Sequence, residues 1–259
     1  MYHSLTFGEE GNTKNTWDDW HLIPTSRPTF SFPEVKKHQV DIPGGNGVID
    51  LTSSLTGYPN YDNRKGSFEF IVMHSGLSSD AHGSAYNNAS KSEWQAVYSE
   101  IANYLHGQYT YLTYEDDPEY YYKGRFTIDE WNSDEEYSTI TIGYDLEPFK
   151  YSVVDTSNKW KWDPFNFKTG IIRSYSGIAY EPTTTKKLIG TLIPVIPTIS
   201  CSVDSIITVG DVQHRVKVGE HTYRDLIVYP GAQDWTFSVD PSSGASSGSA
   251  SVYFRLRSI

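Results

Sequence analysis

The stretch SKSEWQAVYSEIANYLHG, residues 90–107, is the only part of this 259-residue chain that predicts a clear helix. Its apolar residues recur every three or four positions, which places them on one helical face. Ser90 and Glu93 fit a Ser-x-x-Glu capping box, and Gly107 suits the left-handed residue that ends a helix. We therefore expect a helix over about 91–106. The apolar positions are Trp94, Val97, Tyr98, Ile101, Tyr104 and Leu105.

The residues after this helix alternate with the period of two that is typical of strands. Alternation runs through 108–114, resumes over 119–131 after an acidic turn, and continues over 136–145 after a second turn. The helix is thus expected to lead into a strand and then a hairpin. Upstream, residues 67–73 predict another strand, and the polar stretch 74–90 predicts a long loop.

The N-terminal region contains a segment punctuated by prolines. Pro24, Pro28 and Pro33 each remove a backbone donor, so residues 17–42 are expected on a sheet edge or in an extended arm. Residues 44–47, Gly-Gly-Asn-Gly, predict a turn.

A second region begins near residue 147. Short strands at close spacing, with no helical pattern among them, predict a β-sandwich there. Residues 241–250 have the Ser, Gly and Ala composition of a linker. The strand predicted over 251–259 either closes this sandwich or returns to the first domain, and we favour the return. The other strands are predicted at 170–175, 187–193, 196–203, 206–209, 215–218, 225–228 and 234–239.

These patterns predict a mainly β chain of two β domains. The first, over 1–146, is expected to be a β-sandwich or split barrel with the single helix, and the second spans 147–259. Aromatic residues make up 15% of the chain, enough to build both cores despite the few aliphatic residues.

Charge and cysteine content exclude several functions. The formal net charge of −11 argues against binding to nucleic-acid phosphates or to an anionic membrane surface. The single cysteine, Cys201, excludes an intrachain disulfide and a cysteine-based zinc site. No run of 18 apolar residues and no signal peptide is found, so a soluble protein is expected.

No motif predicts catalysis, a metal or a cofactor. Glu115, Asp116 and Asp117 could supply paired carboxylates, but adjacent acids before a proline are more often a solvated turn. His74 and His82 share the long loop with Asp80, which could hold a metal, although exposed loop histidines are more common. We expect no catalytic residue, no metal ligand and no cofactor.

Two groups of aromatic residues have both a functional and a structural interpretation. Trp160, Trp162 and Trp235 could form a platform for a sugar ring, but filling the core is the more common role. Trp17 and Trp20 precede the proline-punctuated segment, where exposed tryptophans would favour a subunit or partner interface. The anchors predicted for that interface are Trp17, Trp20, Ile23, Pro24 and Phe30.

Several sequence blocks occur in the order and spacing of a known family. The chain resembles the distal tail proteins of siphophages, with the likeness strongest over 12–150. The blocks are NTWDDWHLIP (15–24), VDIPG (40–44), NRKGSF (63–68), YLHG (104–107), DDPEYYYKGRF (116–126), YDLEPF (144–149) and WKWDPF (160–165).

This resemblance implies a structural protein of the phage tail tip. Such proteins have an N-terminal β domain that assembles into a homo-hexameric ring and a C-terminal galectin-like β-sandwich. Their partners are the tail-tube protein, the tail-associated lysin or tip protein, and the receptor-binding or baseplate proteins. The implied location is the virion tail tip, with the host cytoplasm as the site of assembly. An acidic ring would also let DNA pass without binding.

The galectin-like fold does not itself imply sugar binding. His214 and Arg215 are adjacent here, whereas the galectin signature places an Asn-Pro between its His and Arg. The function we expect is therefore a non-enzymatic tail hub of a phage or prophage. The alternative is a carbohydrate-binding module that uses the aromatic residues of the second domain.

Overall fold

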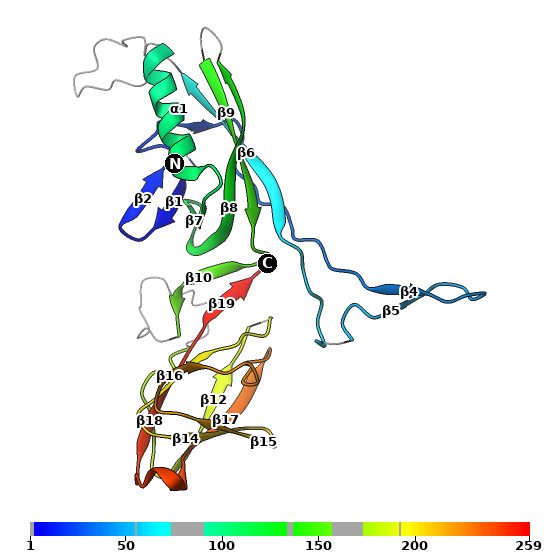
Figure 1. The fold of residues 1–259 in the computed structure, drawn as a ribbon, viewed down its shortest axis with the longest axis vertical. Coiled ribbons are helices and arrows are strands. Elements are labelled where there is room, and N and C mark those ends of the chain that lie inside the picture. The colour runs from blue at the N-terminus through cyan, green and yellow to red at the C-terminus, as the bar shows by residue number, and fades with distance from the viewer. Residues whose placement is uncertain (1–2, 55, 74–90, 134–136, 157–172, 192) are drawn as a thin grey trace. The chain divides into compact units, whose positions relative to one another are not determined.

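A computed structural model of the protein describes residues 3–54, 56–73, 91–133, 137–156, 173–191 and 193–259 (Figure 1). The chain divides into two units. Unit 1 comprises Met1–Lys150 with Ile259, and unit 2 comprises Tyr151–Ser258. The boundary predicted from the sequence lies at 146/147, and the structural division lies at 150/151.

Unit 1 is built on an antiparallel sheet. Its strands follow the order β2-β1-β7-β8-β9-β6-β3. Strands β8 and β9 form the central hairpin, and β7 and β6 flank it on either side. A separate two-stranded hairpin, β4 with β5, belongs to the same unit. The strands are β1 (Leu5–Glu9), β2 (Asn12–Asn15), β3 (Ile23–Pro24), β4 (Gln39–Asp41), β5 (Val48–Asp50), β6 (Arg64–Met73), β7 (Tyr109–Tyr114), β8 (Asp117–Ser133) and β9 (Tyr137–Leu146).

The predicted helix is confirmed as α1 (Lys91–Leu105), which packs against β8. Ile101 and Leu105 are fully buried, as the apolar face requires. Gly107 has a φ of 75°, so the predicted left-handed helix end is also confirmed. The proposed capping residue Ser90 lies outside the described residues.

Alternation along the central hairpin gives the sheet two different faces. On β8, Tyr122 and Phe126 point into the core, while the intervening Lys123 and Arg125 do not. The three strands predicted after the helix are confirmed as β7, β8 and β9, each within about three residues of its expected ends.

Unit 2 contains two four-stranded antiparallel sheets, with orders β11-β18-β13-β16 and β12-β17-β14-β15. Its core includes Trp235, Phe237 and Ile207, all fully buried. The prediction of a mainly β chain with two β domains is confirmed. The strands are β10 (Lys150–Asp155), β11 (Ile178–Tyr180), β12 (Thr183–Ile189), β13 (Thr198–Cys201), β14 (Ser205–Val209), β15 (Val212–Val216), β16 (Gly219–Thr222), β17 (Ala232–Val239), β18 (Gly248–Tyr253) and β19 (Arg255–Ser258); β10 pairs with β19.

Two predicted strands of this region are not found among the described residues. Residues 173–175 form no strand, and 170–172 lie outside the described residues. Residues 225–228 contribute only the single bridge between Val195 and Val228. Short apolar runs predict such strands poorly because they also occur wherever a loop is buried.

The predicted linker 241–250 is also wrong. A short 3₁₀ helix (Pro241–Ser243) begins it, and β18 starts at Gly248. A Cβ atom at Gly248 would lie 2.7 Å from the ring of Tyr180, so a residue without a side chain is needed for this close approach. The stretch 251–259 forms two elements: its first part lies in β18, which pairs with β13, and its last part is β19, which pairs with β10.

Among the described residues, no helix is both long and apolar enough to cross a membrane.

We expect Trp235→Ala to lower the free energy of unfolding by about 3–5 kcal/mol, because it removes a fully buried indole. Val212→Ala, at an exposed apolar position of the same unit, should change it by less than about 0.5 kcal/mol. Chemical denaturation followed by circular dichroism measures both. Equal, small effects of the two variants would contradict a core role for Trp235.

Candidate functional site

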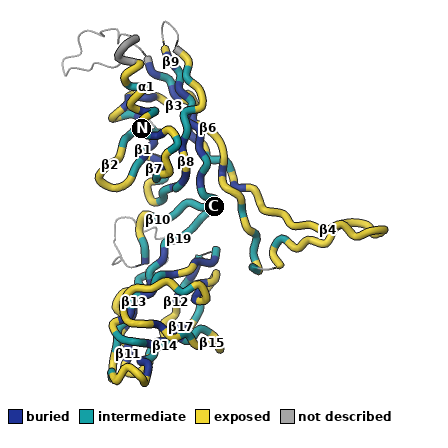
Figure 2. Tube along the Cα trace, viewed as in Figure 1, coloured by how far each residue is buried: buried dark blue, intermediate teal, exposed yellow. Residues whose placement is uncertain are grey.

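Residues 31–63, here called the arm, leave the core of unit 1 and return to it. Its two sides pair through the bridge between Val35 and Tyr61, and the backbone N–H of Lys36 donates to the carbonyl of Asn60 at 2.8 Å. Further out, β4 pairs with β5 around the turn predicted at 44–47. Figure 2 shows β4 within an almost continuously exposed segment.

The hairpin of the arm is amphipathic. Val40 faces Ile49 across the two strands, and the alternation continues to Ile42 and Leu51 on the same side. The opposite side carries Gln39, Asp41 and Asp50 with Val48. All four apolar residues of the first side, here called the apolar stripe, are exposed, and Phe32 at the beginning of the arm is 81% exposed.

A two-stranded hairpin has no hydrophobic core of its own in which the apolar stripe could be buried. Two strands alone are marginally stable in water, and full burial of one aliphatic side chain is worth about 1.5–3 kcal/mol. A contiguous exposed apolar surface on a folded protein is typical of an interaction site. The arm is therefore the strongest candidate for a functional surface.

The base of the arm is fixed by aromatic packing. The ring of Phe30 stacks on Tyr122 with centroids 4.0 Å apart and meets Phe68, Tyr114 and Tyr144 at steeper angles. The hydroxyl of Tyr144 accepts a hydrogen bond from the backbone N–H of Ser31 at 3.0 Å. Phe30 thus anchors the arm within its own chain.

Arg64 ties both ends of the arm to the end of unit 1. Its Nε donates to the carbonyl of Pro148 at 2.8 Å, and a terminal nitrogen donates to the carbonyl of Ser31 at 3.2 Å. Its guanidinium carbon lies 5.6 Å from the centroid of Tyr122. The residue is 3% exposed, and this burial lowers the pKa of the guanidinium. The other terminal nitrogen has no hydrogen-bond partner among the described residues.

The anchors predicted from the sequence occupy different environments. Ile23 is exposed on β3, and Pro24 and Trp17 are half-buried. Trp20 is 1% exposed and packs against Phe7 and Tyr104, so it cannot anchor a surface contact as it stands. Trp20 is buried because the fold brings Phe7 and Tyr104 against it, and the sequence alone does not predict these contacts.

Sequence reasoning missed the apolar stripe of the arm. The signal was present, because Val40, Ile42, Ile49 and Leu51 alternate with other residues on both sides of the Gly-Gly-Asn-Gly turn. Such a pattern predicts a hairpin with one apolar face. It could not reveal that no described part of the same unit covers that face.

The tryptophans predicted as a sugar platform do not provide one where they are described. Trp235 is fully buried beside Phe237 in the core of unit 2. Trp160 and Trp162 lie outside the described residues. A buried ring cannot stack on a saccharide.

The acidic turn of unit 1 is structural. Asp116 accepts a hydrogen bond from Tyr114 at 2.8 Å, lies 2.6 Å from a terminal nitrogen of Arg27, and lies 2.8 Å from Nδ1 of His3. Glu115 accepts from the backbone N–H of Ser4, and Asp117 pairs with Lys150 at 2.6 Å. The side chain of Asp116 is 7% exposed, so the prediction of a solvated turn is wrong at this residue.

Competing effects act on the carboxyl group of Asp116. Burial raises its pKa, but the hydrogen bonds from His3, Tyr114 and Arg27 more than offset this and leave the pKa below its usual value. The carboxylate of Asp116 therefore holds His3, near the N-terminus, and Arg27, before the arm, against the turn that joins β7 and β8.

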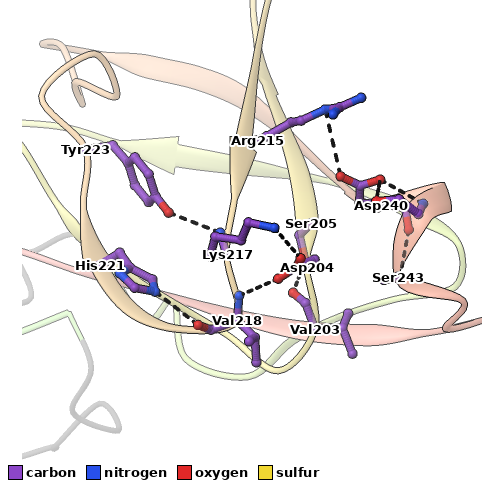
Figure 3. Close-up of polar contacts among 11 residues, drawn as sticks. Val203, Asp204, Ser205, Arg215, Lys217, Val218, His221, Tyr223, Asp240 and Ser243 are labelled. Carbon is purple, nitrogen blue, oxygen red and sulfur yellow. Dashed lines mark hydrogen bonds and ion pairs between the residues drawn. The ribbon is translucent and has the colours of Figure 1, made fainter.

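A second polar cluster joins turns at one end of unit 2 (Figure 3). Asp204 pairs with Lys217 at 2.8 Å and accepts from the backbone N–H of Val218 at 2.9 Å. Asp240 accepts from the N–H of Ser242 and lies 3.8 Å from Arg215. Each carboxylate thus binds groups of neighbouring turns and fixes their conformation, which indicates a structural role.

The described residues contain no group of three or more His, Cys, Asp or Glu side chains placed to hold a metal. His74, Asp80 and His82, which were considered as metal ligands from the sequence, lie outside the described residues. Cys201 is buried beside Tyr180 and Ser205, and burial raises the pKa of its thiol.

Comparison with known proteins identifies the fold. No protein-family profile and no curated protein sequence matches this chain. Among solved structures, it is similar to the crystal structure of SPP1 Dit (gp 19.1), with a TM-score of 0.55 and 11% identity over 98% of this chain and 99% of that chain. This chain has the Dit fold. SPP1 Dit is described as a paradigm of the hub adsorption apparatus in phages that infect Gram-positive bacteria. The Dit fold extends over both units here, including the second, where the sequence likeness was weaker.

We expect Arg64→Met to lower the free energy of unfolding by about 2–3 kcal/mol, because it leaves the carbonyls of Ser31 and Pro148 without their donors. Lys65→Met is the matched control: Lys65 is exposed and pairs only loosely with Asp145 at 3.7 Å, so its loss should cost less than about 0.5 kcal/mol. Thermal melting and denaturant titration measure both. Similar losses for the two variants would argue against Arg64 as the tie at the base of the arm.

The lowered pKa of Asp116 predicts a pH dependence. A carboxyl group with a lowered folded-state pKa contributes stability above its unfolded pKa of about 3.8, and this contribution is lost as the pH falls through the folded pKa. Asp116→Asn should therefore be less stable than the parent at pH 7, and the difference should shrink as the pH approaches 3.

Melting temperatures measured between pH 3 and pH 7 test this expectation. Asp18→Asn, at an exposed acid of the same unit, is the control and should follow the parent at every pH. A difference between Asp116→Asn and the parent that does not depend on pH would rule out the carboxylate as the cause.

Proposed function

We propose that this chain is a structural component of a phage tail, a non-enzymatic hub that assembles into a hexameric ring. The ring would join the tail tube to the tail tip or baseplate and support the host-adhesion proteins. The chain would then be located at the tip of the virion tail, after assembly in the bacterial cytoplasm.

The observation that carries this proposal is the Dit fold over nearly the whole chain, combined with an arm whose apolar stripe is exposed. A hub needs surfaces that stay open until other subunits arrive, and the stripe is such a surface. Head-to-tail contacts of this kind close into a ring when the rotation between subunits permits.

The charge balance also supports a conduit. With a net charge of −11, the chain lacks the surplus of cations that binds DNA phosphates. DNA passing through a ring of such subunits would not be held by electrostatic attraction to its wall.

The test is the oligomeric state of the purified chain. Size-exclusion chromatography with light scattering should give a species of six times the monomer mass, and negative-stain microscopy should show rings. A second experiment adds a tail-tube protein and a tip protein in excess, to test whether the ring closes only against these neighbours. A chain that stays monomeric alone and with both neighbours would overturn the proposal.

Ile49→Asp should prevent assembly, because it places a charge in the centre of the apolar stripe. The monomer should keep its melting temperature, since the side chain is exposed and supports no core. Val212→Asp, which charges an exposed apolar residue of unit 2, is the matched control and should still form rings. Rings formed equally by Ile49→Asp would remove the arm from the proposal.

A further inference from the structure

The outer turn of the arm contains the only Asn-Gly dipeptide of the chain, Asn46-Gly47. It lies in the loop that connects β4 to β5, beyond the last cross-strand pair of the hairpin, which joins Asp41 and Val48. Both residues of the dipeptide are exposed, and neither belongs to the apolar stripe. Asparagine is one of the thermolabile residues of proteins, so its surroundings here decide whether its side chain is stable.

The backbone of the loop leaves Asn46 outside any regular element. The backbone N–H of Gly45 donates to the carbonyl of Ile42 at 3.0 Å, and Gly44 has a φ of 75°, which is the geometry of a type II turn. Gly47 has a φ of 84° and leads directly into β5. Asn46 therefore lies between a turn and a strand, and belongs to neither.

The two groups that could react with each other are free of other contacts. Among the described residues, neither the side chain of Asn46 nor the backbone N–H of Gly47 forms a hydrogen bond. A Cβ atom added at Gly47 would meet no other part of the chain within 4 Å, apart from its chain neighbours. The hairpin has only two strands, and such a ribbon opens easily in water. The backbone nitrogen of Gly47 can therefore approach the side-chain carbonyl carbon of Asn46.

Other described asparagines are restrained. The side-chain oxygen of Asn15 accepts from the backbone N–H of Trp17 at 2.8 Å, and its side-chain nitrogen donates to Thr6 at 2.8 Å. Asn132 lies in β8, opposite Thr139 of β9. A paired strand keeps the backbone extended, so the following nitrogen reaches the side-chain amide only after local opening. Neither restraint acts on the exposed dipeptide of the arm.

We propose that Asn46 is a site of spontaneous, base-catalysed deamidation. The backbone nitrogen of Gly47 gives its proton to hydroxide and attacks the side-chain carbonyl carbon of Asn46. The bond from that carbon to the amide nitrogen then breaks, and ammonia leaves with a proton taken from water, which regenerates the hydroxide. The succinimide ring that remains adds one water molecule at either carbonyl and opens to aspartate or isoaspartate. The net reaction converts one amide and one water into a carboxylate and an ammonium ion.

The products change the hairpin in two ways. Both add a negative charge to a loop whose flanking strands already carry Asp41 and Asp50. Isoaspartate also adds one methylene group to the main chain between the turn and β5. Loop length sets the register that keeps Val40 opposite Ile49, so the isoaspartate form should lose this pairing. The reaction needs only the isolated chain and water, so it is independent of the proposed ring.

Peptide-mapping mass spectrometry of the parent chain, incubated at neutral and at alkaline pH, tests the site. The peptide that contains Asn46 should gain the mass difference between an amide and a carboxylic acid, at a rate that rises with hydroxide concentration. The peptide that contains Asn132 should react at least roughly tenfold more slowly, which corresponds to about 1.4 kcal/mol of barrier. Labelling by an isoaspartyl methyltransferase identifies the isoaspartate product.

Two results would overturn the inference. One is an equal rate at Asn46 and Asn132 in the folded chain. The other is an unmodified Asn46 in the folded chain under conditions in which a synthetic peptide of residues 40–52 is deamidated. The variant Asn46→Gln is the matched control, because its longer side chain must close a larger ring, and its arm peptide should keep its mass throughout the incubation.

NMR measures the effect on the hairpin. The cross-strand contact between Val40 and Ile49 should be lost in an aged parent sample that mass spectrometry shows to be mostly isoaspartate. Fresh Asn46→Asp, which adds the charge without the extra methylene group, should keep the contact, and so should aged Asn46→Gln. A contact that persists in the isoaspartate form would contradict the expected change of register.

Discussion

The long strand β8 is the constraint on which the rest of unit 1 depends. Its 17 residues alternate between a core face and an open face, and each face determines a different property of the unit. On the core side, Phe126 packs with Phe7, and Tyr122 receives the ring of Phe30 and lies beside Arg64. On the other side, the ammonium group of Lys123 lies 5.4 Å from the ring centroids of Tyr109 and Tyr111. A shift of one residue in the pairing of β8 would exchange the two sets and remove both the helix packing and the base of the arm.

The arm combines a fixed base with an exposed apolar surface. Its base is held by the buried guanidinium of Arg64 and by the stacked rings of Phe30 and Tyr122. These contacts within unit 1 offset the conformational entropy lost when the base of the arm becomes ordered. Its outer hairpin leaves apolar residues in water, which is unfavourable for an isolated chain and favourable once a neighbour covers them. Substitutions at the base of the arm are therefore expected to change the free energy of unfolding. Substitutions in the outer hairpin are expected to change the proposed assembly.

Local patterns predicted the helix, the strand after it and the central hairpin because each of these elements is specified by residues close in sequence: a cap, an apolar period and a turn. The role of an individual aromatic residue was harder to predict. Trp20 was predicted as an interface anchor and is a core residue, whereas Trp235 is buried, as its favoured interpretation as a core residue predicted. Burial of such a residue depends on strands that are distant in the chain. The Ser- and Gly-rich stretch 241–250 had the composition of a linker, yet its Gly248, at the start of β18, leaves room for the ring of Tyr180. Composition alone does not distinguish small residues that give flexibility from small residues that allow close approach.

Residue order along the chain was therefore sufficient for the class of fold and the single helix, because repeated short-range periodicities carry that information. The resemblance to distal tail proteins rested instead on short blocks of specific residues. The sequence also contained the apolar alternation around residues 44–47, without any sign of whether the hairpin would be covered. Three features required the folded chain: the burial of Arg64 at the base of the arm, the enclosure of Asp116 by His3, Arg27 and Tyr114, and the placement of Lys123 over the ring of Tyr109. Each brings together side chains from separate strands, and the distance between such side chains follows from strand order and register, which no local pattern encodes.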